Sequence, residues 1–156
     1  MLLKSCLWVF FISMLPIVEL RGAIPVGAAL GLPIWLNYLL CVVGNFLPVP
    51  FILLFIGKIL NWMKGVKRLD KIALWLEAKA QKHSAKVMKG VAVGLFLFVA
   101  IPLPGTGAWT GSLVAALFNM RKRYALPAVF LGVLTAGVIM ALGSYAVVGL
   151  FEIFTH

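Results

Sequence analysis

Two charged residues, Glu19 and Arg21, stand close together in a stretch of the chain that is otherwise apolar. An arginine guanidinium stays charged and binds phosphate or carboxylate through a planar fork of N–H donors. A glutamate side chain can gain or lose a proton when burial moves its pKa toward neutrality. We therefore expect Arg21 to bind an anionic substrate and Glu19 to serve as a proton-coupling residue. A structural ion pair between the two side chains is the alternative.

A second candidate site lies in residues 100–111, in the middle of another apolar run. Pro102, Pro104, Gly105 and Gly107 forbid a regular helix there, because proline removes a backbone donor and glycine weakens what remains. In lipid, unpaired backbone is tolerated only where it is buried in protein or lines a wet cavity. Residues 17–25, which contain Glu19 and Arg21, form a similar break in the first half.

The second break offers groups suited to an anion. The turn around Gly105 and Gly107 can expose backbone N–H groups, and the half-helix after it presents a positive dipole end. Thr106 and Thr110 add hydroxyl groups, so these four residues join Arg21 as predicted substrate-binding residues. Trp109 either stacks on a substrate or packs at the hairpin tip. No nucleotide-binding loop signature is present.

Composition sets the class of protein. The chain has 156 residues, of which 63% are hydrophobic, and its mean hydropathy is +1.11. A soluble domain of this size cannot bury so much apolar surface, so residues 1–156 are predicted to form a single membrane domain. The net charge of +10 is carried by residues that flank apolar spans. This placement indicates membrane topology and not a nucleic acid partner.

Metal, cofactor and enzyme chemistry are not expected. The two cysteines, Cys6 and Cys41, lie in apolar runs without a disulfide framework or a metal-ligand spacing. A membrane hydrolase needs a nucleophile, base or metal set within the membrane, and both histidines lie outside it. We therefore predict no metal, no cofactor and no enzymatic activity.

Segment lengths predict two hairpins and two spans. Residues 5–18 and 90–101 would reach only about 21 Å and 18 Å as helices, short of a hydrocarbon core of about 30 Å. The apolar runs that begin at Pro33 and Ala125 are each nearly 30 residues long, so they can cross. Pro48 and Pro50 should kink the first of them. A signal peptide is the alternative for residues 2–18.

Charge placement then orients the chain. Residues 62–89 carry eight basic and two acidic residues at helical spacing, which predicts an amphipathic helix on the cytoplasmic membrane surface. A second basic cluster, residues 121–123, lies on the same side only if residues 90–120 enter and leave by one face. The fold class expected is an all-α integral membrane protein, an inverted repeat of a re-entrant helical hairpin plus a transmembrane helix. The repeats are residues 1–62 and 90–156, residues 63–89 connect them, and both termini lie outside.

The final span predicts a homodimer. Gly132, Gly137, Gly143 and Gly149 give it small-residue faces for close helix packing. Two hairpins and two spans are also few helices to shield a polar site from lipid.

The two breaks carry a family resemblance over essentially the whole chain. The sequence ELRGAIP at residues 19–25 and PLPGTGAWTG at residues 102–111 resemble the small multidrug export family of bacterial and archaeal membrane proteins. This resemblance implies a multi-pass protein of the inner (plasma) membrane of a prokaryote. The architecture also resembles the larger DedA proteins, which include translocases of undecaprenyl phosphate. The present chain is shorter, and its second hairpin lacks the arginines found there.

Together these features predict a transporter or lipid translocase with its site between two facing re-entrant hairpins. An anionic, phosphate-bearing lipid or amphiphile is favoured over a cationic drug, because Arg21 stands beside Glu19 and leaves no unpaired carboxylate. Small-molecule or multidrug efflux and a non-transporting membrane scaffold are the alternatives.

Overall fold

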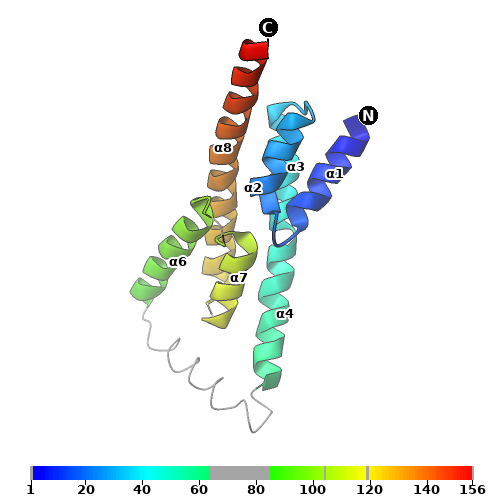
Figure 1. Ribbon diagram of the computed structural model, residues 1–156. Helices are drawn as coiled ribbons and strands as arrows, with labels where there is room; N and C mark the ends of the chain where they lie inside the picture. Colours follow the sequence, from blue (N-terminus) through cyan, green and yellow to red (C-terminus); the bar gives the residue numbers. More distant parts are fainter. Residues whose placement is uncertain (1, 64–84, 104, 119, 156) are drawn as a thin grey trace.

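The computed structural model describes residues 2–63, 85–103, 105–118 and 120–155. Its elements in these ranges are all α-helices (Figure 1). They are α1 (Leu2–Met14), α2 (Glu19–Ala29), α3 (Ile34–Phe46), α4 (Pro48–Met63), α6 (Ala85–Ala100), α7 (Ala108–Leu117) and α8 (Lys122–Thr155). Most of the predicted amphipathic helix, residues 64–84, lies outside the described residues.

Among the described residues, two stretches of helix are long and apolar enough to cross a membrane. They are Ile34–Ile56, with 23 residues, and Lys122–Phe151, with 30 residues. The first is interrupted at Leu47, where α3 ends at Phe46 and α4 begins at Pro48, next to the prolines at which the sequence predicts a kink. Together with the composition, these spans make the chain an all-helical membrane protein.

The shorter helices form two hairpins. In the first, α1 and α2 are joined by residues 15–18, and in the second, α6 and α7 are joined by residues 101–107. The second break lies where Pro102, Gly105 and Gly107 predict it. The first break is shorter than expected, because helix α2 begins at Glu19 and contains Pro25. Helix α2 packs on α1, α3 and α8, and this packing holds the helix around the proline.

The hairpins point toward each other from opposite ends of the molecule (Figure 1). The N-terminus, the α2–α3 turn and the end of α8 lie at one end. The end of α4 and the starts of α6 and α8 lie at the other. Both hairpin tips lie near the middle of the two long helical stretches. Helix α1 packs on α3 and α6 packs on α8, while α2 packs on α8 and α7 packs on α4.

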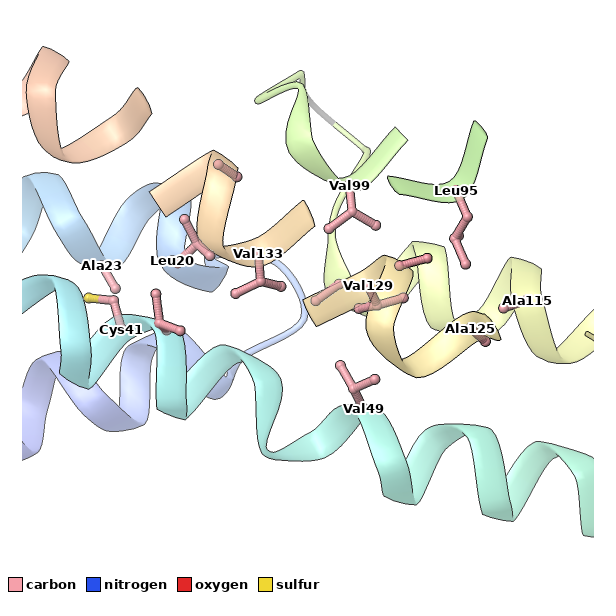
Figure 2. Close-up of a cluster of buried hydrophobic side chains, with 14 of the residues drawn as sticks. Leu20, Ala23, Cys41, Val49, Leu95, Val99, Ala115, Ala125, Val129 and Val133 are labelled. Carbon is pink, nitrogen blue, oxygen red and sulfur yellow. The ribbon is translucent and has the colours of Figure 1, made fainter. Parts of the chain in front are cut away.

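Small and β-branched side chains fill the centre. Figure 2 shows Val129 and Val133 of α8 in the middle of this cluster, with Val49 of α4, Val99 of α6 and Leu20 of α2 around them. Each of these five side chains is almost completely buried. Their compact shapes allow helices from both halves to approach α8 closely, which brings the two hairpin tips together.

The glycines of α8 divide into two groups. A Cβ at Gly132 would lie 2.6 Å from the Val99 side chain, and a Cβ at Gly137 would lie 2.8 Å from the ring of Tyr38. These two glycines therefore serve packing within the chain. Gly143 and Gly149 have no such neighbour among the described residues, so only they remain for the predicted packing between copies.

Candidate functional site at the hairpin tips

Glu19 is the first residue of α2, directly after the turn of the first hairpin. Its backbone has φ +51°, which is unusual for a residue other than glycine. Its N–H donates to the carbonyl oxygen of Leu15 at 2.9 Å, which closes the turn. This conformation starts the helix abruptly, and the buried side chain of Glu19 reaches the second hairpin.

The Glu19 carboxylate caps the N-terminus of α7. Its Oε1 accepts a hydrogen bond of 3.1 Å from the backbone N–H of Trp109, the second residue of α7. The residue before α7, Gly107, has no side chain to do this. The first N–H groups of a helix lack internal partners and carry partial positive charge. A carboxylate at this end accepts a hydrogen bond from them and also balances their charge.

Arg21 acts in the corresponding way at the C-terminal end of α6. Its Nη2 donates to the carbonyl oxygens of Val99 at 3.1 Å and Ile101 at 3.2 Å. Its Nη1 donates to the carbonyl oxygen of Leu103 at 3.3 Å. The last carbonyl groups of a helix lack internal partners and carry partial negative charge. The first hairpin therefore supplies a cation and an anion to the two helix ends that flank the second break.

The two charges contact each other less closely than they contact these helix ends. The distance from Arg21 Nη1 to Glu19 Oε2 is 3.9 Å, which is long for a charge-assisted hydrogen bond. The structural ion pair that the sequence offered as the alternative role therefore accounts for only part of the contacts of Glu19 and Arg21. The indole N–H of Trp109 adds a third link, donating at 3.0 Å to the carbonyl oxygen of Met14 at the end of α1. We call the side chains of Glu19, Arg21 and Trp109 the interlock.

Gly107 leaves the space that the interlock needs. A Cβ at Gly107 would lie 2.1 Å from Glu19 Oε2 and 2.6 Å from its carboxyl carbon, far closer than van der Waals contact allows. Backbone conformation also favours glycine at both positions, since φ is +83° at Gly105 and +156° at Gly107. The hydroxyl of Thr106 donates within the turn, toward the carbonyl oxygens of Ile101 and Leu103 at 2.9 Å each.

A cavity of about 550 Å³ opens beside the interlock. Five of the six residues that the sequence predicts as a site line it: Glu19, Arg21, Gly105, Thr106 and Thr110. The sixth, Gly107, is buried against Glu19. Residues separated by some 80 positions thus meet at one cavity, with its walls drawn from both hairpins and Met140 of α8.

Arg21 has hydrogen-bonding capacity left. A guanidinium has five N–H donors, and its three bonds to carbonyl groups leave two. Among the described residues, none accepts a hydrogen bond from these two donors. Glu19, in contrast, is buried and already accepts from Trp109. Arg21 therefore has donors that no described residue accepts from, whereas the Glu19 carboxylate already holds a backbone N–H.

Metal binding finds no basis in the described part of the chain. It contains no group of three or more His, Cys, Asp or Glu residues that could hold a metal ion. Cys6 and Cys41 are free thiols.

Comparison with known families identifies one family for this chain. Residues 19–139 match the family model described as "Putative small multi-drug export protein". The chain belongs to this family. The matched region begins at Glu19, so it includes the three interlock residues and the second hairpin tip. Residues 16–18 and Met140, which also line the cavity, lie outside it. The curated proteins and the solved structures gave no match.

Sequence reasoning missed one buried polar cluster. Asn37 of α3 donates to the carbonyl oxygen of Ile24 at 2.8 Å and to the hydroxyl of Tyr145 at 3.2 Å. Tyr145 in turn donates to the carbonyl oxygen of Leu32. The sequence features that could have indicated this cluster are an asparagine in an apolar helix and a tyrosine near the end of the final span. These bonds fix the α2–α3 turn to α8 and so hold the first hairpin in position.

Proposed function

We propose that this small multidrug export protein is a membrane transporter or lipid translocase with its substrate site in the tip cavity. The substrate proposed is an anionic, phosphate-bearing lipid or amphiphile. The observation that carries this proposal is the cavity itself, where the two hairpins bring Arg21, with spare donors, beside the glycine turn and two threonines. A scaffold has no need of a polar cavity at this depth.

Both hairpins are proposed to be re-entrant. Helix α1 has 13 residues and α6 has 16, which gives lengths of about 20 Å and 24 Å against a hydrocarbon core of about 30 Å. The packing partners also correspond: α1 with α3 matches α6 with α8, and α2 with α8 matches α7 with α4. This pairing supports an inverted repeat, and inverted repeats of broken helices place transport sites near the bilayer midplane.

Orientation follows from the basic residues. We propose that the protein lies in the inner membrane of a prokaryote with both termini outside and residues 121–123 in the cytoplasm, as positive-inside topology favours. The dimer also remains a proposal, and the open faces at Gly143 and Gly149 support it.

A labelling experiment tests the topology. In a variant without Cys6 and Cys41, single cysteines at Lys58 and Lys122 should react with a membrane-impermeant maleimide from the same side. A cysteine at Lys4 should react from the opposite side, because the starts of α1 and α8 lie at opposite ends (Figure 1). Opposite labelling at Lys58 and Lys122 would mean that residues 90–120 cross the membrane and would end the re-entrant proposal.

Transport in proteoliposomes tests the function. Labelled lipid phosphates and cationic drugs are compared for binding, exchange and pH-driven uptake, with each variant normalised to folded protein. Arg21→Lys keeps the charge but loses the fork, so binding of the phosphate-bearing substrate should weaken about tenfold. Glu19→Gln keeps an oxygen for the Trp109 N–H but cannot titrate, so exchange should survive while pH-driven accumulation stops. Lys4→Gln, far from the cavity, serves as the control.

Three outcomes separate the candidate functions. Uptake of drugs but not of lipid phosphates would support multidrug export, the activity in the family's description. A folded protein that moves neither class would support a scaffold. Full pH-driven uptake in Glu19→Gln would remove Glu19 as the coupling residue.

A further inference from the structure

A second cavity lies between the arms of the second hairpin. Its volume is about 370 Å³ and its lining is almost entirely apolar. The principal lining residues are Val91, Leu95 and Phe98 of α6, Val114 and Ala115 of α7, and Phe118 at the end of α7. We call this cavity the hairpin slot.

The slot exists because the second hairpin is splayed. Helices α1 and α2 pack directly against each other along the first hairpin, whereas α6 and α7 contact each other much less. Helix α6 packs mainly on α8, and α7 packs mainly on α4. The slot follows α6 from Val91 to Phe98, a helical rise of about 10 Å at 1.5 Å per residue.

Basic side chains stand at the outer end of the slot. Met120 lines the slot, and Arg121, Lys122 and Arg123 follow it, all exposed. Arg123 lies over the ring of Tyr124, 4.9 Å from its centroid. Within the described ranges the only ion pair is Glu19 with Arg21, so no described acid neutralises this cluster.

The position of these cations on α8 also favours an anion. Lys122 and Arg123 occupy the first turn of α8, where no acidic residue is present. A helix N-terminus carries partial positive charge, which disfavours cations and favours an anionic group. A phosphate at this point would interact favourably with both the side chains and the helix end.

We propose that the hairpin slot binds one acyl chain of an anionic phospholipid, with the lipid phosphate on Arg121, Lys122 and Arg123. The apolar slot excludes the headgroup, and the exposed cluster at its mouth selects for net negative charge. This lipid site is separate from the tip cavity and requires only that the protein lies in a membrane, so it does not depend on the proposed transport.

Photocrosslinking of the full-length protein in liposomes tests the slot. Phosphatidylglycerol and phosphatidylcholine carry the same acyl chains with a diazirine, and the modified residues are mapped by mass spectrometry. Phosphatidylglycerol should label the slot residues about fivefold more than phosphatidylcholine, as expected for a basic residue near an anionic headgroup. Gly94→Phe should abolish this labelling, because Gly94 lines the slot.

Gly90→Phe is the matched control. Gly90 lies one turn earlier on α6, is not a lining residue, and like Gly94 has open space around its Cβ position, so both variants should fold. Labelling of the slot in Gly90→Phe should equal that of the unmodified protein. Labelling that persists in Gly94→Phe would show that the slot does not hold the chain.

The basic cluster is tested separately. Lys122→Gln combined with Arg123→Gln should remove the preference for phosphatidylglycerol, whereas Lys4→Gln, at the other end of the molecule, should retain it. Equal labelling by the two lipids in the unmodified protein would mean that bulk lipid fills the slot, and the proposal would fail.

Discussion

Gly107→Ala should destabilise the protein more strongly when Glu19 is present than when Glu19 is replaced by glycine, and a part of the cost should remain in both cases because Gly107 has φ +156°. The added methyl group would lie 2.1 Å from the Glu19 carboxylate, so either the turn or the carboxylate must move. Overpacking of this kind costs about 1–3 kcal/mol or more, and displacing the carboxylate also removes the cap of α7. Glu19→Gly removes the side chain and suits the backbone, because Glu19 has φ +51°.

The measurement is a double-mutant cycle on thermal unfolding of the purified protein. The cost of Gly107→Ala should be smaller by at least about 1 kcal/mol in the Glu19→Gly background, which is the coupling expected for side chains in contact. Gly149→Ala, with open space around its Cβ position, should cost little in either background. An equal cost in both backgrounds would show that Gly107 is needed for its turn and not for its contact with Glu19.

The second large effect concerns the signs of the charges in the interlock. The double variant Glu19→Arg with Arg21→Glu exchanges the two charges. It should not restore the folded yield that either single substitution lowers. The exchange would place a cation at the N-terminus of α7 and an anion against the carbonyl groups of Val99, Ile101 and Leu103. Both contacts then oppose the helix dipoles, and the Val99 carbonyl group loses its side-chain donor, whereas those of Ile101 and Leu103 still accept from Thr106.

Folded yield and melting temperature check this expectation. Loss of one partner from a buried charged network costs about 3–5 kcal/mol, so each single exchange should sharply reduce folded protein. Glu19→Gln retains an oxygen that accepts from the Trp109 N–H, so it should fold nearly normally and serves as the control. Recovery in the double exchange would mean that the 3.9 Å ion pair, and not the helix ends, holds the tips.

Much of the architecture could be predicted from the sequence. Length and hydropathy distinguish the long stretches α3–α4 and α8 from the short hairpin helices, and proline and glycine mark the breaks at Leu47 and at residues 101–107. The charges Glu19 and Arg21 indicate where the two halves meet, because charges in apolar surroundings need partners. The start of α2 was predicted less well, since tertiary packing holds Pro25 inside a helix.

The partners of the two charges could not be predicted. Arg21 binds a carbonyl group 78 residues away, and Glu19 binds an N–H group 90 residues away. Every residue carries these backbone groups, so nothing in the side-chain pattern identifies the ones that are used. Only the three-dimensional meeting of the tips shows that the two residues act on opposite ends of one break.

The two halves of the chain contribute different kinds of group to the interlock. The first hairpin contributes both charges, and the second contributes the backbone groups that receive them. An assembly of two copies of the first half would bring two glutamates and two arginines together, without the glycine turn that accommodates Glu19. Two copies of the second half would leave both sets of helix ends uncapped. A symmetric assembly built from identical halves would therefore need a different tip.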